Sequence, residues 1–319
     1  LEGLRLGNGV GATQFLCKAK DQPVTVMGLQ FPNPVGMAAG MDKNGDYIDA
    51  LGSLGFGFIE IGTTTPRPQP GNPKPRIFRL QNANAMINRL GFNNKGVDYL
   101  VGQVKRRKFK GILGINIGKN FDTPNDRAVD DYRTCLEKVY PYADYITINI
   151  SSPNTKGLRD LQDEQQFDAL LGSLNELRNE LADQHQQHKP LVVKVAPDLT
   201  DEQIPGMADI IAKNRFEGLI ATNTTISREA VRGMKHAAEQ GGLSGAPLKA
   251  QSDHVLAAFR AALPPEIALI GTGGITCGAD AADKIRLGAN LVQFYTGFVY
   301  KGPDLVADCL KAIAKQTQK

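Results

Sequence analysis

Polar side chains of the kinds that bind small molecules stand at the ends of short hydrophobic runs in this sequence. Lys194 lies inside the run VVKV (192–195), Asn149 precedes the segment SSPN (151–154), and TNTT (222–225) ends a further run. Asn, Thr, Ser and Lys side chains are costly to bury unless they find hydrogen-bond partners. Convergent amides and hydroxyls without an acidic cluster favour a polar organic ligand over a metal ion, and we predict no metal site.

Two lysines have positions that indicate a specific role. A lone lysine in a hydrophobic run such as that of Lys194 needs a partner or a lowered pKa. Lys194 could form a Schiff base, as in aldolases, or donate to an electron-rich ring of a bound cofactor. Lys43, which follows Asp42, is a second cation and would suit an anionic substrate.

Glycine-rich segments toward the C-terminus have the composition of a phosphate site. GTGG (271–274) and YTG (295–297) each follow a hydrophobic run, and GLSG (242–245) lies upstream. Glycine lets backbone N–H groups approach a phosphate closely, and a following helix adds the favourable end of its dipole. We predict phosphate binding there, although GTGG alone also fits a tight strand-to-helix turn.

The elements that must position these residues alternate regularly. Short hydrophobic runs are separated mostly by amphipathic stretches, for example 167–184, where apolar residues recur at helical spacing. This pattern predicts the α/β class and a (β/α)8 TIM barrel with a parallel eight-stranded core, whose functional groups gather at the carboxyl ends of the strands. An open doubly wound sheet is the alternative. The expected strands are Val35–Ala39, Phe58–Gly62, Ile112–Ile117, Tyr145–Ile150, Leu191–Val195, Gly218–Thr222, Ala268–Gly271 and Asn290–Tyr295.

Small extra strands are predicted outside the barrel. Residues 76–80 and 85–88 follow the proline-rich segment 65–76 and can pair as a hairpin. Residues 24–29 are predicted to turn at Gly28 and to close the bottom of the barrel.

Composition excludes several classes of protein. The chain has 319 residues, of which 41% are hydrophobic, so wholesale disorder is excluded. Its net charge of +4 is too small for a nucleic-acid-binding footprint, and we expect no nucleic-acid partner. The four cysteines form no C-x-x-C pair, and no stretch reaches the roughly 18 apolar residues of a membrane span.

Longer motifs make the sequence similar to a known family. They are AAGMDKNG (38–45), IGTTTPRPQPGNPKPRIFRL (61–80), NRLGFNN (88–94), INIGKN (115–120), NISSPNTKGLR (149–159), KVAPD (194–198), ATNTT (221–225), GGLSG (241–245), GTGGI (271–275) and LVQFYTGFVYKGP (291–303). With them the chain resembles class 2, quinone-linked dihydroorotate dehydrogenase. The resemblance implies an FMN enzyme that oxidises (S)-dihydroorotate to orotate and reduces a membrane quinone in de novo pyrimidine (UMP) biosynthesis.

The resemblance also implies roles for individual residues. Ser152 would be the catalytic base that takes the C5 proton, while the C6 hydride passes to flavin N5. Class 1 members of the family carry cysteine at this position, so the serine indicates the quinone-linked class. The residues expected to contact FMN are Ala39, Gly40, Thr63, Asn116, Asn149, Lys194, Thr222, Gly245, Gly274, Tyr295 and Thr296. Those expected around dihydroorotate are Lys43, Asn88, Arg89, Leu90, Gly91, Phe92, Asn149, Asn154, Asn223 and Thr224, and those at the quinone site are Arg79 and Tyr295.

The same resemblance implies an N-terminal helical extension that lies on the membrane and forms a tunnel to the flavin. We expect residues 1–23 to be a remnant of this extension and residues 24–319 to form the FMN-binding barrel. The expected location is peripheral, on the cytoplasmic side of the inner membrane, with the extension as the attachment. A monomer is the favoured oligomeric state.

Overall fold

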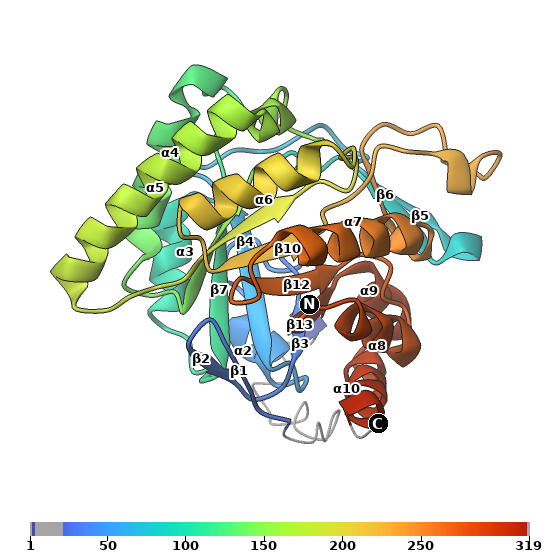
Figure 1. Ribbon diagram of the computed structural model, residues 1–319. Helices are drawn as coiled ribbons and strands as arrows, with labels where there is room; N and C mark the ends of the chain where they lie inside the picture. The colour runs from blue at the N-terminus through green and yellow to red at the C-terminus, as the bar shows by residue number, and fades with distance from the viewer. Residues whose placement is uncertain (1, 4–21, 318–319) are drawn as a thin grey trace.

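Eight parallel strands, buried on both faces, close into a barrel in the computed structural model, which describes residues 2–3 and 22–317 (Figure 1). Their Val, Ile and Leu side chains pack outward against helices and inward on one another, as the continuous hydrophobic runs predict. The closed barrel confirms the (β/α)8 prediction and excludes the open sheet. In order around the barrel the strands are β3 (Val35–Met37), β4 (Phe58–Thr64), β7 (Ile112–Ile117), β8 (Tyr145–Asn149), β9 (Leu191–Val195), β10 (Gly218–Ala221), β12 (Ala268–Thr272) and β13 (Leu291–Phe294).

Helices surround the barrel and cover its outer face (Figure 1). The helix predicted at 167–184 is present and begins three residues earlier, at Glu164, because Asp163 caps it by accepting a hydrogen bond from the Gln165 N–H. The α-helices are α2 (Ile48–Gly52), α3 (Val97–Val104), α4 (Ala128–Val139), α5 (Glu164–His185), α6 (Gln203–Lys213), α7 (Lys249–Ala262), α8 (Gly278–Arg286), α9 (Thr296–Lys301) and α10 (Asp304–Thr317). Short 3-10 turns are η2 (Gln81–Ala83), η3 (Asn125–Arg127), η4 (Leu158–Gln162), η5 (Glu229–Val231) and η6 (Ala246–Leu248).

A hairpin closes the amino end of the barrel, as predicted. It consists of β1 (Val24–Val26) and β2 (Leu29–Phe31), which turn at Gly28 with a φ of 73°. Phe31 is fully buried and meets the ring of Phe58 edge-on, with the ring centroids 5.4 Å apart. The hairpin thus seals this end with apolar side chains, and the opposite end stays available for a ligand.

Phe58→Ala should lower the free energy of unfolding by about 3–5 kcal/mol, because it opens a cavity among fully buried rings. Phe58 is 0% exposed and packs against Tyr145 as well as Phe31. Urea denaturation followed by circular dichroism measures the loss. Phe121→Ala is the matched control, since that ring is 63% exposed; equal effects of the two substitutions would contradict the packing described.

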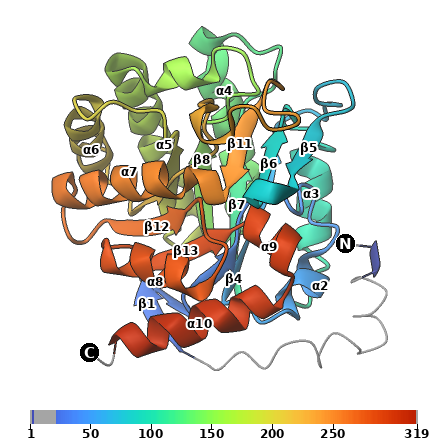
Figure 2. The same cartoon turned by 90° about the vertical axis from the view of Figure 1, so that its right-hand side faces the viewer.

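A second, three-stranded sheet lies at the carboxyl end of the barrel (Figure 2). The predicted hairpin is confirmed as β5 (Ile77–Leu80) paired antiparallel with β6 (Ala85–Asn88). Its third strand, β11 (Gly242–Gly245), pairs with β6 and was not expected from the sequence. This pairing carries one of the glycine-rich segments to the mouth of the barrel.

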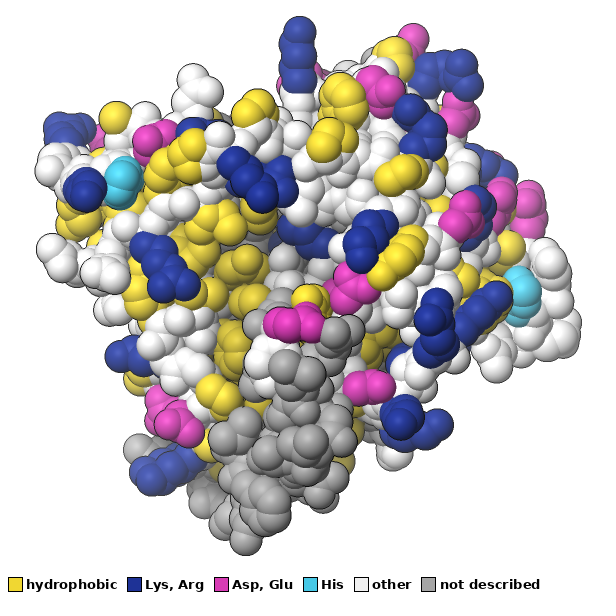
Figure 3. Space-filling model, turned by 180° about the vertical axis from the view of Figure 1, so that it is seen from behind, with side chains coloured by type: hydrophobic (Ala, Val, Ile, Leu, Met, Phe, Trp, Pro, Cys, Tyr) yellow, Lys and Arg dark blue, Asp and Glu magenta, His cyan; other side chains and the backbone are white. Residues whose placement is uncertain are grey.

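The boundary predicted at residue 23 stays a prediction, because residues 1 and 4–21 lie outside the described part of the chain. Within residues 2–3 and 22–317, no helix is long and apolar enough to span a membrane. On the face seen in Figure 3, basic and acidic side chains are interspersed with hydrophobic ones.

Candidate active site

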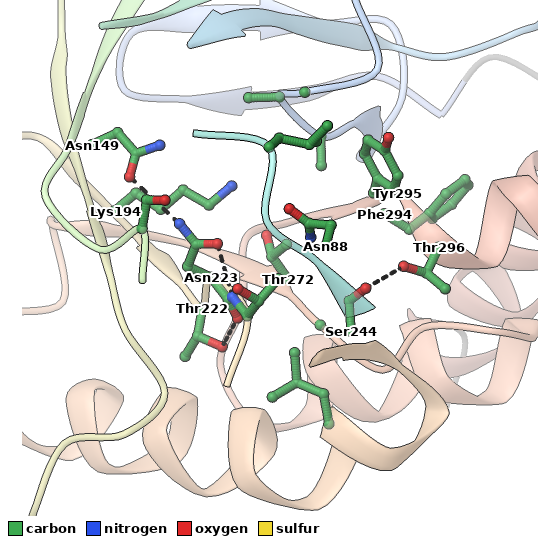
Figure 4. A pocket seen from close by; sticks show the side chains of 18 of the residues that line it. Asn88, Asn149, Lys194, Thr222, Asn223, Ser244, Thr272, Phe294, Tyr295 and Thr296 are labelled. Carbon is green, nitrogen blue, oxygen red and sulfur yellow. Dashed lines mark hydrogen bonds between the residues drawn. The ribbon is translucent and has the colours of Figure 1, made fainter. Parts of the chain in front are cut away.

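The carboxyl ends of the barrel strands and the small sheet enclose one pocket, which brings together most of the residues singled out from the sequence (Figure 4). Of the expected cofactor residues, those that line it are Ala39, Gly40, Thr63, Asn149, Lys194, Thr222, Gly245, Gly274, Tyr295 and Thr296. Of the expected substrate residues, those that line it are Lys43, Asn88, Leu90, Gly91, Phe92, Asn149, Asn154, Asn223 and Thr224. Ser152 lines it too.

Three expected site residues do not line the pocket. Asn116 is fully buried beneath it, where its Oδ1 accepts hydrogen bonds from Thr63 Oγ1 at 2.5 Å and Asn149 Nδ2 at 3.1 Å. Arg89 turns away and pairs with Glu239, with 2.6 Å between Nη1 and Oε2. Arg79 is exposed on β5. Asn116 therefore holds the lining residues Thr63 and Asn149 in place. The guanidinium groups of Arg89 and Arg79 lie outside the pocket.

The loop that carries Lys43 is tied down by its neighbour, Asp42. The Asp42 carboxylate accepts hydrogen bonds from the backbone N–H groups of Gly45 at 2.8 Å, Asp46 at 3.0 Å and Tyr47 at 2.7 Å. Burial raises the pKa of Asp42, and these donors act in the opposite direction. The loop is thereby fixed where β3 ends, with the Lys43 side chain directed into the pocket.

Lys43 and Lys194 give the pocket its charge. Burial lowers the pKa of Lys43 to about 8, and the positive charges of Arg76 and Lys194 contribute to this shift. Burial also lowers the pKa of Lys194, which is 5% exposed. Neither ammonium group has a hydrogen bond or a salt bridge within the described part of the chain, so the pocket presents unpaired cations suited to an anionic or electron-rich ligand.

A buried carboxylate lies under the pocket and was not among the site residues predicted from the sequence. Glu60 of β4 is 0% exposed and accepts hydrogen bonds from Asn116 Nδ2 at 2.8 Å and from the hydroxyls of Tyr145 and Thr147 at 3.1 Å each. Its negative charge opposes the lowering of the Lys194 pKa. The sequence does contain an indication of Glu60, because a single Glu in the hydrophobic run FIEIG is as unusual as Lys194 among its valines.

Amides and hydroxyls surround Ser152 without a histidine. Asn223 donates to Ser151 Oγ at 2.9 Å, and Asn154 Nδ2 lies 3.3 Å from Asn88 Oδ1. Ser152 is 7% exposed, and its Oγ accepts a hydrogen bond from the Asn154 N–H at 3.2 Å. All four histidines of the chain lie in its described part, and none lines the pocket.

The glycine-rich segments meet at one side of the pocket, as predicted for a phosphate site. Gly273 has a φ of 108° and Gly274 a φ of 78°, conformations that favour glycine. The Thr272 hydroxyl beside them is buried and has no partner among the described residues. Four further lining residues, Ser244, Thr272, Gly273 and Gly297, belong to the glycine-rich segments predicted to bind phosphate, whereas Ala38, Leu248, Ile275 and Phe294 were not predicted to be site residues. The sequence could have indicated these residues, because they lie in or close to the glycine-rich segments and the strand ends.

Fold and site together define a (β/α)8-barrel enzyme, because a pocket at the carboxyl ends of the strands is where barrels of this kind carry their chemistry. The family model "Dihydroorotate dehydrogenase" matches residues 22–316. The chain belongs to the dihydroorotate dehydrogenase family, a family of flavoenzymes.

Individual relatives agree with this assignment. A protein of Herminiimonas arsenicoxydans named dihydroorotate dehydrogenase (quinone) is 56% identical over 99% of this chain and 92% of its own length. The protein of the same name from Ralstonia nicotianae is 58% identical over 99% of this chain and 93% of its own length. Among solved structures, a DHODH of Eimeria tenella in complex with ferulenol is 38% identical, with a TM-score of 0.90 over 98% of this chain and 90% of that one.

Proposed function

We propose that this protein oxidises (S)-dihydroorotate to orotate, with a quinone as electron acceptor, in de novo pyrimidine (UMP) biosynthesis. The observation that carries the proposal is that Ser152, Lys43 and Lys194 meet in one pocket and that neither lysine has a hydrogen bond or salt bridge to another described residue. A base, a carboxylate partner and a cation for an electron-rich ring are the groups that this reaction requires.

FMN is the flavin that we propose for the pocket, and the residues present fit it. Lys194 and the Thr272 hydroxyl are buried without a hydrogen-bond partner among the described residues, and Gly273 and Gly274 leave the backbone accessible beside them. The chemistry that bound FMN would supply is an acceptor for the hydride that leaves C6 of dihydroorotate. The residues proposed to hold it are Ala39, Gly40, Thr63, Asn149, Lys194, Thr222, Gly245, Gly274, Tyr295 and Thr296, with Asn116 supporting Thr63 and Asn149 from below.

The substrate residues are proposed on chemical grounds. The carboxylate of dihydroorotate would pair with Lys43, whose ammonium has no partner among residues 2–3 and 22–317. Asn88, Asn154 and Asn223 would bind the imide and urea groups of the ring, because each amide can both donate and accept. Ser152 Oγ would take the C5 proton and pass it to water.

The acceptor and the location are part of the same proposal. The relatives from H. arsenicoxydans and R. nicotianae carry "quinone" in their names, which supports a quinone acceptor here. We place the quinone near Tyr295, with Arg79 farther out on β5. Peripheral attachment to the cytoplasmic side of the inner membrane through residues 1–23, and a monomeric state, stay predictions.

The purified protein should be yellow, and its flavin absorbance should bleach when dihydroorotate is added without oxygen. A quinone analogue should then restore the colour. A colourless protein that releases no flavin on denaturation would refute the proposal. Borohydride trapping of substrate on Lys194 would instead indicate a Schiff-base enzyme.

A further inference from the structure

A lysine with no contact to solvent lies directly behind the glycine-rich turn. Lys284, on the inner face of α8, is 0% exposed. Its Nζ lies 2.7 Å from Asp253 Oδ1 and donates to Ser252 Oγ at 2.9 Å, both on α7. Gly271 makes room for its stem, since a Cβ at that position would lie 2.7 Å from Lys284 Cδ. None of these side chains lines the pocket.

Lys284 decides how the Ser252 hydroxyl can be used. An ammonium group can only donate, so Ser252 Oγ must accept from Lys284 and has one proton left to donate. Two carbonyl oxygens lie 3.0 Å away, those of Lys249 and Gly273. The Lys249 carbonyl is in the first turn of α7 and is placed to accept a helical N–H, whereas the Gly273 carbonyl is in the turn and depends on Ser252. The hydroxyl proton is therefore directed to Gly273.

This contact sets the direction of a backbone donor. The peptide bond between Gly273 and Gly274 is trans, so its C=O and N–H point to opposite sides. With the carbonyl held behind the turn by Ser252, the Gly274 N–H faces the pocket side. That N–H has no hydrogen-bond partner within the part of the chain that the structure describes.

We propose that Lys284, acting through Ser252, is a positioning residue for cofactor phosphate: it orients the Gly273–Gly274 peptide so that the Gly274 N–H donates to the phosphate of FMN. The inference rests on the proposed function. Burial lowers the pKa of Lys284, and its pairing with Asp253 acts in the opposite direction. This pair and the one between Lys249 and Asp283, at 2.9 Å, link α7 to α8 behind the turn.

The test is a competition between FMN and riboflavin, which differ only in the phosphate. Full-length enzyme is equilibrated with mixtures of the two flavins, and the flavin retained after rapid gel filtration is quantified by chromatography. Ser252→Ala and Lys284→Met should each reduce the preference for FMN by roughly tenfold, which corresponds to about 1.4 kcal/mol, because the Gly274 N–H would no longer be directed at the charged phosphate. Lys213→Met is the matched control, because it removes an exposed lysine that pairs with Asp168 on the outside of the barrel.

The outcomes separate a positioning role from a purely structural one. The inference would be overturned if the variants lost affinity for FMN and riboflavin by the same factor, or if Ser252→Ala left the preference for FMN unchanged. If Lys284→Met does not fold, Ser252→Ala alone decides, because it keeps the Lys284–Asp253 pair. Anaerobic bleaching by dihydroorotate is measured on the unsubstituted enzyme in parallel. Its failure would count against the proposed reaction and would leave the flavin preference as a separate result.

Discussion

Ser152→Ala is expected to slow reduction of the bound flavin by dihydroorotate about 10²–10⁴-fold, the usual contribution of a positioned general base. No histidine lines the pocket to replace it. The Asn154 N–H donates to Ser152 Oγ at 3.2 Å, which would stabilise negative charge on that oxygen as it loses its proton. Anaerobic stopped-flow measurement of flavin bleaching gives the rate directly and does not involve the quinone.

Two controls accompany this variant. Orotate binding, followed through the flavin spectrum, should change less than about twofold, because the serine acts on the reaction and the asparagines carry the ring contacts. Ser227→Ala, at an exposed serine outside the pocket, should leave the rate unchanged. An unchanged bleaching rate in Ser152→Ala would show that another group takes the proton.

Lys43→Ala should weaken dihydroorotate and orotate binding roughly 10–100-fold while flavin content stays the same, because a charge-assisted contact to the carboxylate is lost. The effect should depend on pH. The pKa of Lys43 is about 8, so the ammonium is present below pH 8 and is lost as the pH rises through that value. Orotate affinity of the unsubstituted enzyme should therefore fall above pH 8, and in Lys43→Ala this dependence should disappear.

Orotate titrations between pH 6 and pH 10 test this prediction, since they cover both sides of the Lys43 pKa of about 8. Lys43→Arg keeps a positive charge at all these pH values and should bind orotate without the decline above pH 8. Equal losses of orotate and flavin in Lys43→Ala would contradict the assignment of Lys43 to the substrate carboxylate.

Much of the fold could be predicted from local sequence. Strands Ile112–Ile117 and Leu191–Val195 were located to the residue, because strands buried on both faces must be continuously apolar. The α5 helix followed from its apolar stripe. The third strand of the small sheet could not be predicted, because GLSG has no strand-like composition and pairs with β6 only where the barrel brings it.

The candidate site, too, could be predicted from the sequence only in part. Lys194 and the glycine-rich turns are unusual in their local context and could be found without a structure. Arg89 could not be placed, because its partner, Glu239, is 150 residues away. Lys284 lies in the amphipathic segment of α8, and nothing in that segment shows that its ammonium is buried against α7.

The sequence by itself determined the eight hydrophobic runs, the polar residues at their ends and the family, because each of these is a property of a short segment. Only the tertiary structure decided which charged groups pair and which stay unpaired. Closure of the barrel brings Glu60 beneath Asn116 and leaves Lys43 and Lys194 without partners in the pocket. Burial then makes an unpaired charge costly, and this cost is what binding of a ligand of opposite charge can relieve.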